Sequence, residues 1–318
     1  LGVNILSLVN TNKDTIILAL VGVGQVVLYV VIYLYFFSYY EEGDKIKIGK
    51  NAMVMGMSIF LELVLLLISL RGKVISKSSI DLGWGLSNYM AITVNVLIPL
   101  TFYVYLENQK HKEALITVLL EIIVVILTFS KGAILTLALV AIPFYICGYL
   151  FIKDKKKFVK ESLLCLLIMG ISFAVIASIK PLWNAFINYF EAMNSRGWFN
   201  DPSRIKIYKK GLELLKSHPL LGVGPYTGQY YLENNINYHN YIVQTLATLG
   251  LLGLGSFCYY LYTIIKRLVS TNRYHLMVFF VIIIMCIHGL VDTTWYNPLI
   301  MVIVSFYTAA LQTKTSFD

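Results

Sequence analysis

Blocks of about 20 apolar residues recur along the whole chain and are separated by short polar segments. A helix of that length crosses a hydrocarbon core of about 30 Å and satisfies its own backbone hydrogen bonds in lipid. The pattern therefore predicts an all-α, polytopic membrane protein. We predict nine spans, at residues 15–38, 52–70, 89–106, 114–130, 132–152, 162–180, 239–265, 275–295 and 298–312.

The predicted spans divide the chain into three regions. Residues 1–180 hold the first six helices, residues 181–238 form one long loop, and residues 239–318 hold the last three helices. Because the chain starts at Leu1 and not at Met, an N-terminal truncation with loss of further spans is an open alternative.

Composition agrees with this class of protein. Of the 318 residues, 58% are hydrophobic and 14% are charged, and the mean hydropathy is +0.72. A soluble globular chain is nearer to half apolar and a quarter charged. The four cysteines fall inside predicted spans without metal-ligand spacing, so we interpret them as packing residues and predict no metal site.

The basic residues predict the orientation in the membrane. The segments 41–51, 107–113, 153–161 and 266–274 and the C-terminus hold 14 Lys and Arg residues, against 5 in the short segments of the opposite side. The positive-inside rule places the first set in the cytoplasm and the long loop outside. The net charge of +9 is explained by these topology signals and needs no nucleic-acid partner.

The long loop contains a predicted amphipathic helix. Asp201 can cap free backbone amides, and Pro202 suits the first helical position. Four apolar residues follow at helical spacing: Ile205, Tyr208, Leu212 and Leu215. The helix is expected to end near His218 and Pro219. We predict that it lies against the outer face of the membrane.

Positive charge in this loop runs against the usual bias, because the loop carries six Lys and Arg residues against four acidic residues. Long loops can cross the membrane regardless of their charge. Alternatively, the loop binds an anion, and arginine suits phosphate because its planar fork reaches two oxygens at once. The residues alone leave both explanations open.

Two stretches of the chain resemble the signature region of the O-antigen ligase and Wzy-type polysaccharide polymerase superfamily. They read DPSRIKIYKKGLELLKSHPLLGVGPYTGQY and YHNYIVQTLATLGLLGLGSF. The family pattern is an arginine that starts a helix, a PLLGVGP-like turn, and an HN pair before a glycine-containing apolar run. Weaker similarities lie in LTFSKGAILTLAL and LGWGLSNYMAITVNVLIPL, so the resemblance spans roughly residues 82–310.

The resemblance implies a GT-C-like integral membrane glycosyltransferase of the bacterial cytoplasmic membrane, with its active site on the extracytoplasmic side. The implied donor is an oligosaccharide linked to polyprenyl (undecaprenyl) pyrophosphate, and the acceptor is a glycan or lipid-linked glycan. Neither a metal nor another cofactor is implied. We expect a capsular, exopolysaccharide or O-antigen polymerase that works in the bilayer with other polysaccharide-assembly proteins. A ligase that attaches finished glycan to another carrier is the close alternative.

The resemblance also implies which residues bind the pyrophosphate. Arg204 matches the arginine of the family, and its helix N-terminus favours an anion. Lys131 stands at a turn where the family often has arginine. Arg196 is a supporting candidate without a motif match.

His239 is the candidate general base, because a neutral imidazole can accept a proton from a sugar hydroxyl near neutral pH. A histidine at the lip of a span can instead have a purely structural role, but the HN pattern and Arg204 favour catalysis. Asn240 is expected to orient the site or bind a sugar.

Further candidates lie around this histidine. Asp292 and His288 are expected on one face of the eighth span, with Asp292 orienting a histidine or arginine or bonding a neighbouring helix. Tyr226 and Tyr238 are candidates for stacking on sugar faces. Glu121 is expected to pair with another span or to lie in a polar cavity.

Two other classes of protein stay open. A transporter or flippase of lipid-linked oligosaccharide also needs buried ionisable groups, but we find no internal repeat of the kind that transporters show. A non-catalytic scaffold explains the spans, but it does not explain an arginine and a histidine at one interface.

Overall fold

The structure, a computed structural model, describes residues 1–41, 43–71, 73, 75–83, 85–195, 202–232, 237–268 and 272–312. Over these residues its regular secondary structure is helical apart from β1 (Asp81–Leu82) and β2 (Gly85–Leu86), which pair antiparallel. The chain forms two compact units, which we describe one at a time. The first unit is Leu1–Glu42, Phe199–Ser270 and Cys286–Asp318, and the second is Gly43–Trp198 and Thr271–Met285.

Every predicted span overlaps a helix, although the one predicted at 275–295 runs six residues past the end of α11. Six helices are long and apolar enough to cross a membrane: α2 (Ile16–Tyr39), α3 (Asp44–Ser69), α4 (Ser87–Glu107), α6 (Lys131–Phe151), α7 (Lys155–Ser178) and α10 (Tyr241–Leu268). The other predicted spans fall on shorter helices, α5 (Lys112–Leu127), α11 (Arg273–Gly289) and α12 (Pro298–Ala309). The all-α, polytopic membrane class is therefore confirmed, while the number of nine spans stays a prediction.

The second unit is organised around α4, whose side chains are buried almost without interruption from Met90 to Leu106. Glycines on α3 allow close packing: a Cβ added at Gly49 would lie 2.7 Å from Val104, and one at Gly56 would lie 2.1 Å from Glu121. The Glu121 side chain is fully buried on α5, and it accepts a hydrogen bond of 2.8 Å from Thr101 Oγ1 on α4. It therefore pairs with a neighbouring span, as expected.

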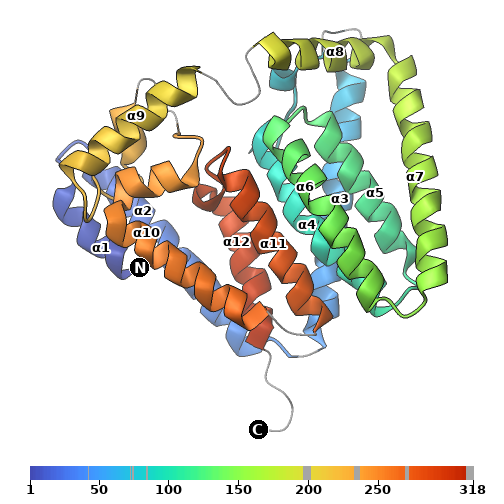
Figure 1. The fold of residues 1–318 in the computed structure, drawn as a ribbon, viewed down its shortest axis with the longest axis horizontal. Coiled ribbons are helices and arrows are strands. Elements are labelled where there is room, and N and C mark those ends of the chain that lie inside the picture. The colour runs from blue at the N-terminus through green and yellow to red at the C-terminus, as the bar shows by residue number, and fades with distance from the viewer. Residues whose placement is uncertain are drawn as a thin grey trace. The chain divides into compact units, whose positions relative to one another are not determined.

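At the edge of this unit, α7 exposes much of its apolar surface, which is what a lipid-facing helix requires. The start of the predicted long loop forms α8 (Lys180–Ser195), which runs across the end of α7 (Figure 1). Trp183 and Phe186 of α8 stack on each other, and both meet the ring of Phe173 on α7 edge to face. The two compact units are defined by contacts between residues, whereas the predicted regions 1–180, 181–238 and 239–318 were defined by membrane topology. The predicted regions therefore stay a prediction.

In the first unit, α9 (Pro202–Ser217) forms where the amphipathic helix was predicted, and its protein-facing side is not the apolar stripe that was predicted to face the membrane. The predicted stripe is largely exposed, with Ile205 at 44% and Leu212 at 45%. Ile207, Gly211 and Leu214 are buried instead. The reason is local, because a hydrophobic cluster with residues after the helix covers Ile207 and Leu214. The exposed stripe is free to lie at a membrane interface, and this position stays a prediction.

Helix α10 is broken at Gly250, which has φ 65° and ψ −160°. The span predicted at residues 239–265 is therefore present but kinked, and the sequence pattern did not predict the kink. Figure 1 shows the orange ribbon of α10 changing direction at this break. The break frees backbone groups, and in lipid these groups need protein partners.

The turn at residues 219–224 supplies these partners. The amides of Leu251 and Leu252 donate to the carbonyls of Pro219 and Leu220, over 2.9 and 3.1 Å. In the other direction, the amides of Val223 and Gly224 donate to Ala247 and Thr248, both over 3.0 Å. The turn therefore fills the break in α10 and fastens α9 to it.

Two glycines make this approach possible. Gly222 has φ 63°, and a Cβ there would lie 2.3 Å from the carbonyl carbon of Thr248. A Cβ at Gly250 would lie 2.5 Å from the carbonyl group of Leu220. Gly222 in the PLLGVGP turn and Gly250 in the following apolar run thus allow one close backbone contact. We call the hydrogen-bonded backbone of residues 219–224 and 247–252 the interlock.

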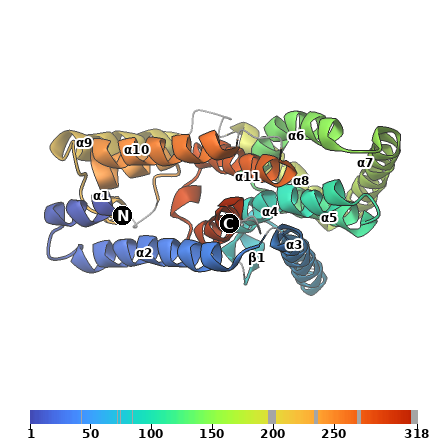
Figure 2. The same cartoon turned by 90° about the horizontal axis from the view of Figure 1, so that it is seen from below.

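Residues near the N-terminus also bind the turn at residues 219–224. Helix α1 (Gly2–Leu6) leads into the 3₁₀ helix η1 (Ser7–Asn10), whose Ser7 hydroxyl donates to the carbonyl of Leu221. The Asn10 amide donates to the carbonyl of Gly222 over 2.7 Å. In Figure 2, α1 lies between the layers formed by α2 and α10. The sequence pattern alone did not predict this segment.

Substituting Gly250→Ala should lower the stability of the first unit by about 2–5 kcal/mol, because the new methyl group meets backbone at a left-handed position. Gly255→Ala is the matched control, since nothing lies within 4 Å of a Cβ at that helical position. We expect a clear fall in the thermal unfolding temperature of purified Gly250→Ala and no fall for Gly255→Ala. Equal unfolding temperatures would contradict the interlock.

Candidate active site

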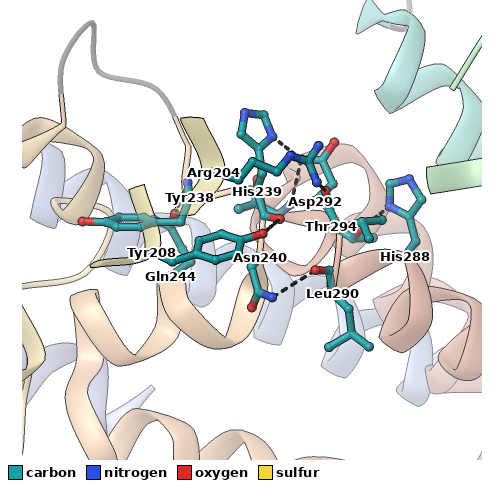
Figure 3. Close-up of polar contacts among 12 residues, drawn as sticks. Arg204, Tyr208, Tyr238, His239, Asn240, Gln244, His288, Leu290, Asp292 and Thr294 are labelled. Atoms are coloured by element: carbon teal, nitrogen blue, oxygen red, sulfur yellow. Dashed lines mark hydrogen bonds and ion pairs between the residues drawn. The ribbon is translucent and has the colours of Figure 1, made fainter. Parts of the chain in front are cut away.

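The candidate site is built on the loop that follows α11. Side chains from two other segments of the first unit hold three consecutive residues of this loop. The Asn240 amide donates to the carbonyl of Leu290 over 3.0 Å, and Arg204 Nη1 donates to the carbonyl of Val291 over 3.1 Å. His239 Nδ1 lies 3.4 Å from Asp292 Oδ1. Figure 3 shows Arg204, His239 and Asp292 lying together beside this loop.

His239 stands directly before α10, in a left-handed conformation with φ 49°. Residues other than glycine seldom adopt this conformation, and where they do the surrounding structure must hold them. Here the Tyr208 hydroxyl of α9 donates to the His239 carbonyl over 3.3 Å. The imidazole is 35% exposed, so it is held in place and is still accessible to a ligand.

Asn240 has a structural function that accounts for the HN pair. Its Oδ1 accepts hydrogen bonds from the amides of Ile242 and Val243, which caps the start of α10. Its Nδ2 binds the Leu290 carbonyl, as described above. Of the two predicted roles, the structure favours orientation of the site over sugar binding.

Asp292 is buried, with its side chain only 9% exposed. Burial alone would raise the pKa of this carboxyl, but the hydrogen bond with His239 and the nearby charges of His288 and His239 outweigh it and lower the pKa below the ordinary value of 3.8. Asp292 is therefore ionised at neutral pH and can accept a hydrogen bond from Nδ1–H of His239. This leaves Nε2 as the ring nitrogen that can take a proton from a substrate.

The contact between His239 and Asp292 is long for a hydrogen bond. Contacts of this kind often tighten only when substrate binds. The amide of Thr293 donates to the same Asp292 oxygen over 2.8 Å and fixes the carboxylate in the loop. Asp292 therefore lies where it can orient His239, and its effect on catalysis stays a prediction.

His288 does not share a helical face with Asp292, and that prediction was wrong. Helix α11 ends at Gly289, so Asp292 lies in the turn beyond it. The turn points Asp292 toward His239, while His288 Nδ1 contacts Thr294 Oγ1 at 2.7 Å. The end of the helix explains the difference, because α11 stops at Gly289 even though the Asp292 amide still donates to the His288 carbonyl over 3.0 Å.

Arg204 lies on the first turn of α9 and is half-buried. The Val291 carbonyl takes one of the five N–H donors of the guanidinium. This acceptor is neutral, so the charge of Arg204 remains available to an anion. The two side chains proposed for catalysis therefore reach the same loop from α9 and from the start of α10.

The other predicted anion ligands cannot be placed relative to this group. Lys131 is the first residue of α6, directly after the turn that ends α5. It belongs to the second unit and Arg204 to the first, so their cooperation stays a prediction. Arg196 lies outside the residues that the structure describes, as does the predicted cap Asp201.

The two tyrosines proposed for sugar stacking differ. Tyr238 is fully buried in the hydrophobic cluster below α9, and its hydroxyl donates to the Gly228 carbonyl over 3.0 Å. A ring in this position cannot stack on a ligand, so its assignment as a sugar-binding residue is corrected to a core role. Tyr226 is partly accessible, with φ 63°, and donates to the Tyr296 carbonyl over 2.6 Å.

Sequence reasoning missed several parts of the site. It did not identify the backbone carbonyls of Leu290 and Val291 or the hydroxyl of Tyr208. Every residue has a backbone carbonyl, so the sequence contains no signal that could have identified the carbonyls of Leu290 and Val291 as acceptors. Tyr208 was assigned to the apolar stripe of α9, although its hydroxyl binds the carbonyl of His239.

Asn240→Ala should lower stability by about 1 kcal/mol through the lost cap and by about another 1 kcal/mol through the lost bond to Leu290. Asn240→Asp keeps an oxygen for the cap and loses only the donor to Leu290, so its loss should be close to half. Thermal unfolding of both variants provides the comparison. If the two substitutions behave alike, the bond to Leu290 contributes nothing.

Comparison with known families agrees with the resemblance found in the sequence. Residues 116–258, a little under half of the chain, match the model of the family described as O-antigen ligase. The match includes Lys131, Arg204, His239 and Asn240 and ends before Asp292. No curated protein matches the chain. The chain therefore carries an O-antigen ligase family domain at residues 116–258, as its motifs predicted.

Proposed function

We propose that this protein is an integral membrane glycosyltransferase that moves a saccharide from polyprenyl pyrophosphate to an acceptor glycan at the outer face of the membrane. The observation that carries the proposal is the meeting of Arg204, His239 and Asp292 at one loop. The O-antigen ligase domain and the membrane-spanning helices support it.

The leaving group is a lipid pyrophosphate, so negative charge increases as the glycosidic bond to it breaks. A fixed cation stabilises such charge best where water is scarce. Arg204 supplies that cation with donors that can bind two phosphate oxygens at once. It also lies in the first turn of α9, where the helix dipole favours an anion. Lys131 is proposed as a second cation, and Arg196 as a third.

The acceptor is a sugar hydroxyl, which must lose its proton as it attacks. His239 Nε2 takes this proton, while Asp292 accepts a hydrogen bond from Nδ1–H and stabilises the imidazolium that forms. The same division of labour between acid and histidine serves in hydrolytic triads. The hydroxyl oxygen bonds to the anomeric carbon, the bond to the pyrophosphate breaks, and inversion of configuration follows from direct attack.

The proposal also covers the membrane topology, the donor carrier and the product of the enzyme. We propose a GT-C-like enzyme with nine spans and an extracytoplasmic loop over residues 181–238, in a bacterial cytoplasmic membrane. The donor is carried on undecaprenyl pyrophosphate, and the reaction needs neither metal nor cofactor. Tyr226 is proposed to contact the sugar. The product belongs to a capsule, an exopolysaccharide or O-antigen, assembled together with other proteins of the same route.

Polymerase and ligase share this chemistry and differ in the acceptor. A polymerase joins repeat units, whereas a ligase transfers finished glycan to another carrier. The description of the matching family favours the ligase as a second candidate. The site residues serve both reactions equally, so the identity of the acceptor decides between them.

The test is a reaction of purified protein in detergent or liposomes with an oligosaccharide linked to undecaprenyl pyrophosphate. A ladder of products indicates a polymerase, and a single transfer to an added carrier indicates a ligase. Either result, with release of undecaprenyl pyrophosphate, supports the proposal. Movement of the donor across the liposome membrane without a new glycosidic bond would indicate a transporter and overturn it.

His239→Ala and Arg204→Ala should each lower the rate of transfer by about 100-fold or more, which is typical of losing a general base or an oxyanion-stabilising group. His218→Ala and Lys209→Ala are the matched controls. His218 lies in the turn after α9, and Lys209 is exposed on α9. The controls should keep nearly full activity, measured as pyrophosphate lipid released per minute. If both site variants transfer glycan at the normal rate, the residue assignment is wrong.

A further inference from the structure

His288 is a buried histidine that the proposed reaction does not use. It lies in the last turn of α11 and is only 2% exposed, so a substrate cannot contact it. Its ring Nδ1 lies 2.7 Å from Oγ1 of Thr294, the first residue of the 3₁₀ helix η5 (Thr294–Tyr296). Figure 3 shows this contact beside the candidate site. Burying a polar side chain is costly unless it is hydrogen-bonded, so the contact holds the imidazole in place.

The contact between His288 and Thr294 closes the loop that carries the candidate site. The two residues stand on either side of segment 289–293. Within this segment, the amides of Val291 and Asp292 donate to the carbonyl of His288, over 2.9 and 3.0 Å. The backbone of His288 therefore fixes the first part of the loop, and its side chain fixes the end of the loop.

The start of the same loop is packed against α10. A Cβ added at Gly289 would lie 2.7 Å from Cδ1 of Tyr241, so the loop has little room to move there. Its course beyond Gly289 then depends on where Thr294 is anchored. Asp292 lies two residues before this anchor, with its carboxylate 3.4 Å from the imidazole of His239. Release of the anchor would therefore let the carboxylate move away from the imidazole.

We propose that His288 is a positioning residue of the site: through its bond to Thr294 it holds Asp292 against the candidate base. The inference rests on the proposed function, since it assigns His288 to the orientation of the group that takes the proton. The charge of His288 is also one of the influences that lower the pKa of Asp292, so the ring lies close to the carboxylate.

The test measures the chemical reactivity of His239 and needs no glycosyl transfer. The probe is diethyl pyrocarbonate, which attaches an ethoxycarbonyl group to a neutral imidazole nitrogen. It is added to the purified full chain in detergent at about pH 8, where a free imidazole is neutral. A carboxylate that accepts from Nδ1–H leaves Nε2 as the attacking nitrogen and makes it more reactive. Mass spectrometry of the peptides gives the modification rate of His239 relative to that of His218, in the turn after α9.

Thr294→Val removes the hydroxyl and little volume, and it should slow the modification of His239 by about 2- to 10-fold, the effect of one lost hydrogen bond. His288→Leu breaks the same contact from the other side, and Asp292→Asn removes the carboxylate, so both should also slow it. Thr294→Ser keeps the hydroxyl and should react like the unsubstituted protein. Simple loosening of the fold would have the opposite effect, because a more exposed imidazole reacts faster.

Thr308→Val is the matched control, because it removes a buried hydroxyl from α12, away from the loop. It should leave the rate unchanged. The proposal is overturned if Asp292→Asn slows the modification while Thr294→Val and His288→Leu do not, and the proposed function then stands. If Asp292→Asn has no effect either, both this proposal and the pairing used in the proposed mechanism are overturned. Failure of the transfer assay alone would overturn the proposed function and leave the reactivity result standing.

Discussion

The arrangement of the first unit depends on how the break at Gly250 is filled. A helix broken inside a membrane leaves amides and carbonyls that lipid cannot bind. The turn at residues 219–224 binds them, and it can do so because Gly222 and Gly250 bring two backbones into contact. One constraint thus explains both glycine motifs of this sequence and joins the helix that carries Arg204 to the one that follows His239.

The candidate active site depends on that interlock. With α9 fastened to α10, Arg204 and the pair His239 and Asn240 bind successive residues of one loop. The buried, ionised Asp292 then lies next to the imidazole, in a loop whose backbone is already held. In our proposal, the guanidinium stabilises the departing pyrophosphate and the imidazole takes a proton, so both groups must be held by rigid elements.

Much of this could be predicted from sequence, and the failures have physical causes. Hydrophobic blocks identify helices reliably because lipid leaves few other structures available, and the HN and PLLGVGP motifs indicated the right region. The side of α9 that packs on the protein, with Ile207, Gly211 and Leu214, was not predicted, because only tertiary packing decides which residues the rest of the chain covers. The break at Gly250 was missed because an isolated glycine in an apolar run is usually tolerated in a helix. Tyr238 was taken for a surface residue because its burial depends on Gly211, 27 positions earlier in the chain.

The central claim is that Arg204 and His239 serve a single substrate, and an experimental structure with a bound donor analogue tests it most directly. The analogue is an undecaprenyl pyrophosphate sugar whose bridging oxygen is replaced by a non-cleavable methylene group. We predict that a phosphate oxygen lies within hydrogen-bonding distance of the Arg204 guanidinium and that the anomeric carbon faces His239 Nε2 across the space for one hydroxyl. A pyrophosphate bound away from Arg204, or an anomeric carbon turned away from His239, would contradict the account.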